Sequence, residues 1–537
     1  MTPNLHTILR DHVSLSVTCL DRLYVNGYMP ALQTSGQLCY FLKEHLGKPI
    51  PSPALFAPLR DRFVRDIERF AQRNEVPVVH FERGERKDDV AAERRRKFDR
   101  REGVVFIGVA QEKMRSFKGS KGQGPLGGVR FNFTRQPVAV NHYYFYVQDA
   151  EWGPAFIKVG SYLPYPVKLC LNGHEWAKQR LRRERVGFES LDNGFLSCQR
   201  PERLQEVCDQ LGPADVQSFF ERWSARLPWP LTAADIEAGF RHRLSLWQVE
   251  VSLTQVFDKP VQGRHFFEEV IRENLDLGRP SRVSLLFPTR TTSRTPPPLH
   301  GYRTRVITTG VNPSLHVEHK RSHVKQYFKE NRALRTETTI NNPGDFQVKK
   351  GVENLTYLRQ LGDQVNHKLL ELERVSQNCA LSQESLDRLQ KPTNENGRHV
   401  PALRFGDARV QALLQALCLF GNLPRRFRNA DLRPHVAALL GLSLDEYKPG
   451  KMTYDLRRLC LKGIIHRVPK THGYVVTSYG LKVALFYTKV YLRIVRPGWT
   501  AIGEPPDDIP RPLRGALEQV DIEIARICDE ARIRPAA

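Results

Sequence analysis

The sequence predicts a multidomain α+β protein, with a mixed N-terminal and central body followed by a separate C-terminal module. The chain has 537 residues, 40% of them hydrophobic, which is enough for two to four hydrophobic cores. Segments with a hydrophobic period of two alternate irregularly with segments of helical period, as is typical of α+β folds. Charge also divides the chain, because residues 398–500 hold 18 Lys or Arg and five Asp or Glu.

Composition and turn signals predict five consecutive parts. They are an N-terminal mixed α/β region with a basic Gly-rich loop (1–136), a central α+β domain (137–375), a linker (376–404), a basic module (405–500) and an acidic tail (501–537). The linker is placed where a polar segment separates two strongly periodic regions.

The expected elements of the N-terminal part are a helix and strands. Phe63, Ile67 and Phe70 recur at helical spacing and predict a helix. "VPVVHF" and "VVFIGVA" are expected to be strands, separated by a mixed-charge stretch. Between residues 113 and 136, six basic residues, no acidic ones and five glycines predict a positively charged loop.

The central part is expected to alternate hairpins and helices. "VAVNHYYFYV" and "PAFIKVG" predict a hairpin, and Asn172 is the expected N-cap of the helix that follows it. "SLWQVEVSLTQVF" fits either a strand or a buried helix. Further helices are predicted over "GRHFFEEVIRENLDLGRP" and over about 352–375, each with a one-sided apolar pattern.

Composition argues against secretion and against a membrane-spanning chain. The first thirty residues lack a basic start followed by an apolar run, and no run of about 18 apolar residues occurs anywhere. The nine cysteines are scattered and never form a C-x-x-C pair, which argues against structural zinc and favours a reducing environment. The expected location is the cytoplasm.

The charge predicts a polyanionic partner. With 82 Lys and Arg against 58 Asp and Glu, the net charge is +24 and the isoelectric point is near 9.8, so nucleic acid is the expected ligand. In the basic loop, Lys118, Lys121 and Arg130 would contact phosphates. The interleaved Phe117, Phe131 and Phe133 would either stack on the bases of RNA or single-stranded DNA or belong to flanking strands.

Residues 405–480 carry the most specific pattern, which is three helices followed by two short strands. This order resembles a winged helix-turn-helix domain of the MarR or ArsR type, and the resemblance implies that the third helix, about 451–462, enters the major groove of DNA. Its predicted contact residues, with those of the wing, are Lys451, Tyr454, Arg457, Arg458, Lys462, Arg467 and Lys470. A winged helix used for protein contacts is the alternative.

The stretch "KQYFKENRALRTETTIN" predicts a polar strand face in the central part. With a period of two, Arg335, Glu337, Thr339 and Asn341 share one side. If this side meets the preceding strand, His316, Glu318 and Glu337 would bind a divalent metal, Mg²⁺ or Mn²⁺.

Such a metal would activate a phosphodiester bond, with Tyr327 as nucleophile or Lys329 neutralising charge. The candidate catalytic residues are Glu337, Tyr327, Lys329 and Arg335. The alternative is a ladder in which Arg335 pairs with Glu337 and only supports the sheet.

"KQYFK" followed by "LRTETTIN" is similar to a passage in the rolling-circle replication initiators of phages and plasmids, which implies a nicking activity. Those enzymes carry two histidines flanking an apolar residue, whereas this chain has His316, Val317 and Glu318. Their tyrosine usually lies on a helix, whereas Tyr327 is predicted to lie on a strand.

Over its longer span, which includes "LNGHEWAKQRL", "GRHFFEEVIRENLDLGRP" and "ALRTETTIN", the chain also resembles a large family of bacterial hypothetical proteins. This resemblance implies a bacterial cytoplasmic origin and nothing about mechanism. The expected function is nucleic-acid binding, with DNA the first partner, by a mobile-element or replication-associated nuclease. The alternatives are a non-enzymatic transcriptional regulator that dimerises or senses a ligand, and an RNA-binding protein.

Overall fold

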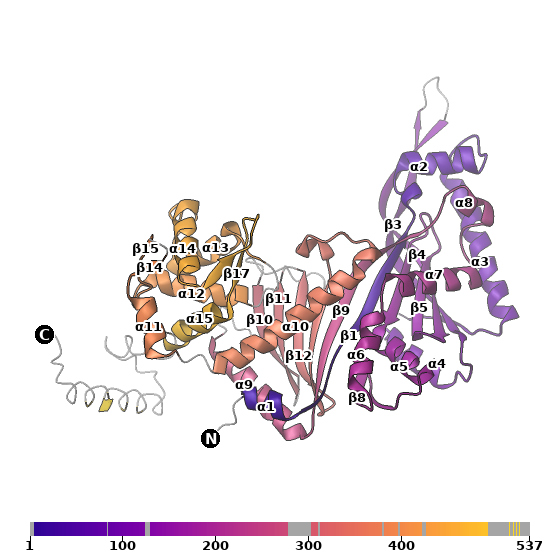
Figure 1. Cartoon of the computed structure of the whole chain (residues 1–537). Coiled ribbons are helices and arrows are strands. Elements are labelled where there is room, and N and C mark those ends of the chain that lie inside the picture. The colour runs from indigo at the N-terminus through magenta and orange to yellow at the C-terminus, as the bar shows by residue number, and fades with distance from the viewer. Residues whose placement is uncertain are drawn as a thin grey trace. The chain divides into compact units, whose positions relative to one another are not determined.

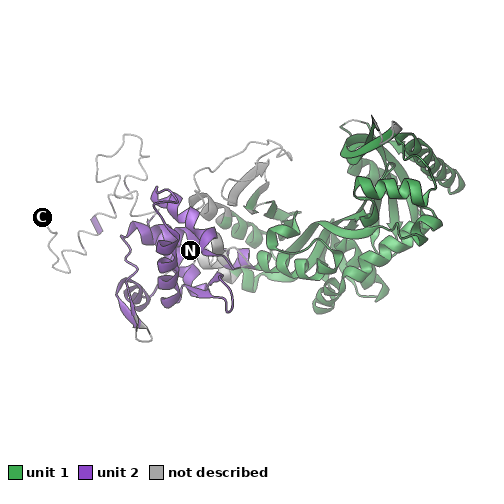
Figure 2. Ribbon diagram, turned by 90° about the horizontal axis from the view of Figure 1, so that it is seen from above, with its two compact units in different colours: residues 1–271, 280–367 green, residues 272–279, 368–537 purple. Residues whose placement is uncertain are grey.

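A computed structural model gives the arrangement of the chain (Figure 1). It describes residues 5–82, 84–123, 129–277, 302–309, 312–319, 321–377, 381–395, 398–421 and 426–491, with five isolated positions between 515 and 526. The described chain divides into two compact units (Figure 2). Unit 1 comprises residues 1–271 and 280–367, and unit 2 comprises residues 272–279 and 368–537.

Unit 1 is built on an eleven-stranded sheet in the order β10-β11-β12-β13-β9-β1-β6-β5-β4-β3-β2. Every neighbouring pair is antiparallel except β2 and β3, which are parallel. The strands are β1 (Val13–Tyr28), β2 (Val78–His80), β3 (Gly103–Gln123), β4 (Val129–Asp149), β5 (Gly153–Gly160), β6 (Val167–Asn172), β9 (Arg243–Phe257), β10 (Tyr302–Thr309), β11 (Asn312–His319), β12 (Ser322–Lys329) and β13 (Ala333–Ile340). A separate hairpin pairs β7 (Phe188–Leu191) with β8 (Gly194–Cys198).

Helices of unit 1 pack against the sheet. They are α1 (Leu5–Asp11), α2 (Ser35–Tyr40), α3 (Phe56–Arg73), α4 (Lys87–Arg96), α5 (Gly173–Arg183), α6 (Pro201–Gln210), α7 (Pro213–Arg226) and α8 (Ala233–Glu237). Helices α9 (Pro260–Leu277) and α10 (Leu355–Gln377) begin in unit 1 and end in unit 2. Short turns of helix lie at Pro30–Leu32, Phe41–His45, Pro53–Leu55, Pro343–Phe346 and Val352–Asn354.

The two faces of the sheet are covered differently. The main core joins alternate strand residues, such as Leu23 and Val25 of β1, with apolar residues of α3, α5, α6, α7 and α10. A smaller cluster on other strand positions joins Phe106 and Tyr146 to Ala91 of α4. Because side chains alternate along a strand, Tyr24, which lies between Leu23 and Val25, faces the other side of the sheet.

The segment predicted to be a basic loop is a long β-ribbon instead. Strands β3 and β4 pair from Gly103 and Gln148 out to Gln123 and Val129. Phe117 and Phe133 are buried in an apolar cluster with Phe56, and the rings of Phe56 and Phe133 are 5.8 Å apart. Of the two alternatives for these rings, Phe117 and Phe133 follow the second, because they lie on β3 and β4 and form part of a core.

Unit 2 contains the basic module. Its elements are α11 (Gln383–Gln390), β14 (Thr393–Glu395), β15 (Arg398–Val400), α12 (Ala408–Gly421), α13 (Asn429–Leu440), α14 (Pro449–Leu461), β16 (Ile465–Arg467), β17 (Tyr474–Val476) and α15 (Ser478–Val490). Leu413, Leu432, Leu456 and Ile465 belong to one apolar cluster. The predicted order of three helices followed by a hairpin is present.

Several predicted boundaries differ from the structure. Residue 136, expected to end a domain, lies within β4. Residues 376–404, expected to be a linker, contain α11, β14 and β15 and belong to unit 2. The predicted acidic tail, 501–537, lies outside the described residues except for the five isolated positions. The chain is an α+β protein, and no helix in the described part is long and apolar enough to cross a membrane.

Candidate functional site

Strand β13 has the alternation that the sequence predicts. Arg335 and Glu337 project to one side, whereas Thr338, on the other side, donates its hydroxyl to Asn366 Oδ1 of α10 at 2.6 Å. All eight residues of the strand are buried. The polar face is therefore an internal network, and each of its charges needs a partner because burying an unpaired charge is costly.

Arg335 lies at the centre of this network and is fully buried. Its Nε donates to Glu337 Oε1 at 2.7 Å, and its Nη2 donates to Asp21 of β1. Nη1 donates to the main-chain carbonyl of Asn193. Nη2 also lies 3.0 Å from His174 Nε2, which must accept because a guanidinium has no lone pair to offer. One guanidinium thus joins β1, β13, α5 and the β7–β8 hairpin.

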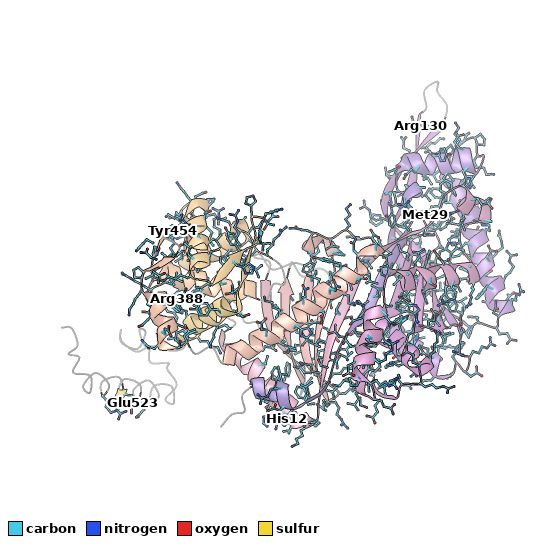
Figure 3. The ribbon with its side chains drawn as sticks, in the orientation of Figure 1. His12, Met29, Arg130, Arg388, Tyr454 and Glu523 are labelled. Carbon is cyan, nitrogen blue, oxygen red and sulfur yellow. The ribbon has the colours of Figure 1, made fainter. Side chains whose placement is uncertain are left out.

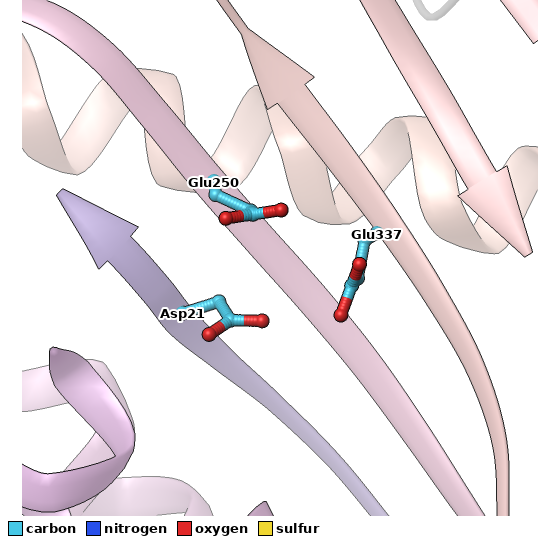
Figure 4. Close-up of side chains that lie close together, drawn as sticks. All are labelled: Asp21, Glu250 and Glu337. Carbon is cyan, nitrogen blue, oxygen red and sulfur yellow. The ribbon is translucent and has the colours of Figure 1, made fainter. Parts of the chain in front are cut away.

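Three carboxyl groups surround this arginine. Asp21, Glu250 and Glu337 each offer an oxygen within 4.8 Å of the others, and Figure 4 shows them converging from three neighbouring strands. Glu250 also accepts a hydrogen bond of 3.3 Å from Thr339 Oγ1. The group carries more negative charge than Arg335 can neutralise, so its members must share protons.

The pKa directions follow from this imbalance. Although burial acts to raise it, the charge of Arg335 lowers the pKa of Asp21 to about 2. Burial and the charges of Asp21 and Glu337 raise the pKa of Glu250 to about 7. Burial is also the main cause that raises the pKa of Glu337, and Arg335 only partly opposes it. Asp21 is thus the firmly ionised member of the group.

Carboxylate oxygens are ligands that Mg²⁺ and Mn²⁺ prefer, so this group is the candidate metal site of the described residues. Arg335 already donates to Asp21 and Glu337. A divalent cation would therefore have to displace guanidinium contacts before it could bind all three carboxylates.

The structure brings three of the four predicted catalytic residues together. Tyr327 Oη donates to Glu337 Oε1 at 2.8 Å, the same oxygen that Arg335 contacts. Burial, followed by the charge of Glu337, raises the pKa of the Tyr327 phenol. Lys329 lies apart from them, with its ammonium 3.4 Å from Glu330.

The predicted metal set of His316, Glu318 and Glu337 is wrong, because Glu337 groups with Asp21 and Glu250 instead. His316 of β11 is opposite Lys325 of β12, and Lys325 is opposite Glu337. Two strand spacings, about 9.6 Å, and a lysine therefore lie between the imidazole and the carboxylate. His316 Nε2 is 3.0 Å from Ser314 Oγ.

In unit 2, the predicted contact residues fall into two classes. Lys451, Arg457, Arg467 and Lys470 are exposed, and Tyr454, labelled in Figure 3, is 49% exposed. These five lie on α14 and on the β16–β17 hairpin with its turn. They form the basic face of unit 2.

Arg458 and Lys462 are buried, so their predicted role in contacting DNA is wrong. Arg458 Nη2 donates to the carbonyl of Ala402. Lys462 Nζ donates to the carbonyl of Arg388 at 2.7 Å and to that of Lys391 at 2.9 Å. Both cations therefore bind the end of α14 to main-chain carbonyls of the segment before α12.

The basic face is held by a buried contact behind it. Asp455 on the inner side of α14 accepts a hydrogen bond of 2.8 Å from Arg409 Nε and one of 2.5 Å from Tyr447 Oη. This fixes α14 against α12 and orients Lys451, Tyr454 and Arg457 outward.

The predicted phosphate contacts on the ribbon are exposed. Lys118 and Lys121 lie on β3, and Arg130, labelled in Figure 3, lies on β4. Register places Lys121 opposite Phe131 and Gly122 opposite Arg130. The three cations therefore gather at the far end of the ribbon.

Sequence reasoning missed Asp21, Glu250, His174 and Asn193. The available signal was a single acidic residue within an apolar strand, in "TCLDRLY" and in "WQVEVSL". A charge in such a position needs a buried partner, but the partner, Arg335, lies 314 residues from Asp21 along the chain.

Comparison with family models, with curated proteins and with solved structures finds no match to this chain. The likeness of residues 405–480 to MarR or ArsR regulators and that of the Tyr327 strand to rolling-circle initiators therefore stay predictions.

Proposed function

We propose that unit 2 binds duplex DNA as a winged helix-turn-helix domain, with α14 in the major groove and the β16–β17 hairpin as the wing. The observation that carries this proposal is the basic face of unit 2. Lys451, Tyr454 and Arg457 follow each other at intervals of three along α14, so they lie along one exposed side of the helix.

The surroundings of this face favour a phosphate backbone. Three more exposed basic residues, Arg426, Arg428 and Lys448, stand at the starts of α13 and α14. Arginine side chains can read guanine in the major groove, and lysine and arginine side chains hold phosphates. The net charge of +24 adds a general attraction to polyanions.

The test is the salt dependence of binding to labelled duplex DNA. The variant Lys451→Ala/Arg457→Ala is expected to weaken binding about tenfold or more and to reduce the slope of log affinity against log salt by about two. Arg65→Ala/Arg73→Ala is the matched control, because it removes two exposed charges from α3 in unit 1. Equal losses in both variants would mean that net charge alone drives binding and would overturn the proposal.

A second candidate function is phosphodiester cleavage in unit 1, favoured by the hydrogen bond from Tyr327 to Glu337. A nucleophile whose proton donates to a base, itself oriented by a third group, is the usual arrangement of covalent catalysis. Tyr327 Oη would attack phosphorus while its proton passes to Glu337 and then to the departing sugar oxygen. The raised pKa of the phenol makes this base necessary.

Cleavage is tested with labelled single-stranded and duplex DNA in Mg²⁺ or Mn²⁺. A covalent protein–DNA adduct that forms with the wild type, and is lost in Tyr327→Phe and slowed in Glu337→Gln, is the expected result. No adduct on any substrate would leave unit 1 without this activity and would favour a non-enzymatic regulator. Lys329→Ala, outside the Tyr327–Glu337–Arg335 group, is the control.

A further inference from the structure

A cavity of about 390 Å³ lies in unit 1, on the sheet face opposite Leu23 and Val25 of the main core. Its walls come from six strands, β1, β3, β4, β5, β6 and β9. The lining residues are Arg22, Tyr24, Glu112, Tyr144, Phe156, Lys158, Lys168, Trp247 and Gln248. These residues define the sheet pocket. Its volume is within the usual range for small-molecule sites, about 300–1,000 Å³.

Strand register explains why these side chains share one face. Lys168 of β6 is opposite Lys158 of β5, and Lys158 is opposite Tyr144 of β4. On the other flank, Tyr24 of β1 is opposite Gln248 of β9. Residues opposite each other in a ladder project to the same side, so the pocket continues across the strands.

Aromatic rings form one part of the sheet pocket. Trp247 is 42% exposed, and its ring lies 5.9 Å from that of Tyr24 at an angle of 78°. The ring of Phe156 is 6.5 Å from Tyr24. A partly exposed indole beside two further rings is a surface on which a planar base can stack, over the part of the ring that Lys168 does not cover.

Positive charge forms the other part. Glu112 is the one carboxylate among the lining residues, and it is already paired with Lys87 and Lys158 and accepts from Tyr144. Within the described chain, neither Arg22 nor Lys168 forms an ion pair with a carboxylate. Lys168 Nζ lies instead 3.0 Å from the centre of the Trp247 ring.

Burial and neighbouring positive charge both act against the charge of Lys168. Burial and the charge of Lys158 lower its pKa to about 8. Nearby positive charge disfavours protonation, and a bound anion would reverse this.

We infer that the sheet pocket binds a nucleotide unit, with the base against Trp247 and Tyr24 and the phosphate between Arg22 and Lys168. The unit is either part of a single strand of nucleic acid or a free nucleotide, because both present the same base and phosphate. The inference rests on unit 1 alone, so it holds or fails independently of duplex binding by the basic face of unit 2.

The experiment uses the full chain carrying Lys451→Ala/Arg457→Ala, which removes the proposed duplex contacts and leaves the sheet pocket intact. Binding is measured by fluorescence anisotropy with labelled oligo(dT) of about eight nucleotides, within the usual site size. A second arm measures displacement of this probe by unlabelled dTMP. Displacement at comparable concentrations assigns the pocket to free nucleotides, and displacement by oligo(dT) alone assigns it to single strands.

In the same background, Trp247→Ala and Lys168→Gln are each expected to weaken oligo(dT) binding about tenfold. Trp247→Phe keeps a ring and is expected to retain most of the affinity. Arg73→Gln, an exposed charge on α3, controls for net charge, and thermal melting controls for folding. Absence of binding to either probe, or binding that folded Trp247→Ala and Lys168→Gln leave unchanged, overturns the inference.

Discussion

At the scale of single residues, the main feature is the buried cluster of Arg335 with three carboxyl groups, which cannot all be ionised together. Arg335 neutralises Asp21, and the remaining negative charge falls on Glu250 and Glu337, whose pKa values are raised. A raised pKa in the folded state means that the folded protein holds a proton which the unfolded chain releases at lower pH.

Glu250 therefore makes stability depend on pH. Its stabilising contribution is complete below the unfolded pKa of about 4.3 and is lost as pH rises through about 7. The side chain of Glu250→Gln cannot ionise. The free energy of unfolding of this variant, relative to that of the wild type, is therefore expected to increase by about 2–3 kcal/mol between pH 5 and pH 8. The measurement is urea unfolding at both pH values. Glu250→Asp keeps a carboxyl group and is expected to retain the pH dependence, so equal behaviour of the Gln and Asp variants would contradict this account.

Part of the candidate site could be predicted from the sequence. The alternation of β13 and the pairing of Arg335 with Glu337 follow from local spacing, and both are confirmed. The metal set failed because alternation gives the side of a strand but not its neighbours. Which strands flank β13 depends on sheet order, and β9 and β1 enter from distant parts of the chain.

At the scale of elements, helices and hairpins with local signals were predictable. The N-cap at Asn172, which accepts from Glu175 N at 3.1 Å, and the hairpin of β4 and β5 are confirmed. The ribbon of β3 and β4 was missed because its glycines and basic residues are typical of a loop. One glycine in it, Gly119, is required by packing, since a Cβ there would lie 2.2 Å from Pro53.

Close approach of α15 to β16 gives an element-scale prediction. A Cβ at Gly480 would lie 1.9 Å from the carbonyl oxygen of Ile464, whereas a Cβ at Gly450 on α14 would meet nothing within 4 Å. Gly480→Ala is expected to destabilise unit 2 by about 2 kcal/mol or more through forced displacement. Gly450→Ala is the matched control and is expected to be neutral or stabilising. Urea unfolding of the two variants decides, and similar stabilities would contradict the packing argument.

At the scale of the whole molecule, separate apolar clusters give each unit its own source of stability. Among the residues that the structure describes, the apolar clusters of unit 1 and that of unit 2 share no residue. The division between them was only partly predictable, because 376–404 has the polar composition of a linker and yet contains α11, β14 and β15. A polar composition indicates that a segment is exposed to solvent. Whether the segment packs into a unit depends instead on contacts such as those of Lys462 with Arg388 and Lys391.

Two independent cores predict two unfolding transitions in differential scanning calorimetry. Arg335→Met leaves Asp21 and Glu337 buried without their partner, and breaking a buried ion pair in this way costs about 3–5 kcal/mol. Arg335→Met is expected to lower the transition temperature of unit 1 alone, whereas Gly480→Ala is expected to lower that of unit 2 alone. A single transition that moves with both variants would show that the units unfold cooperatively.

The register shift in β1 between Leu20 and Leu23 has a thermodynamic consequence. It places Asp21 among the three buried carboxylates and the adjacent Arg22 in the sheet pocket. The charge of Arg22 partly opposes the rise in the pKa of Glu250. A phosphate that neutralises Arg22 would therefore raise the affinity of Glu250 for a proton, and proton affinity and ligand affinity must change reciprocally.

Calorimetric titration near pH 7 in buffers of different ionisation enthalpy would measure this exchange. Proton uptake on nucleotide binding is the expected result, and its loss in Glu250→Gln would identify the group that takes up the proton. In that case, binding of a ligand in the sheet pocket would change the protonation of Glu250 in the buried carboxylate cluster.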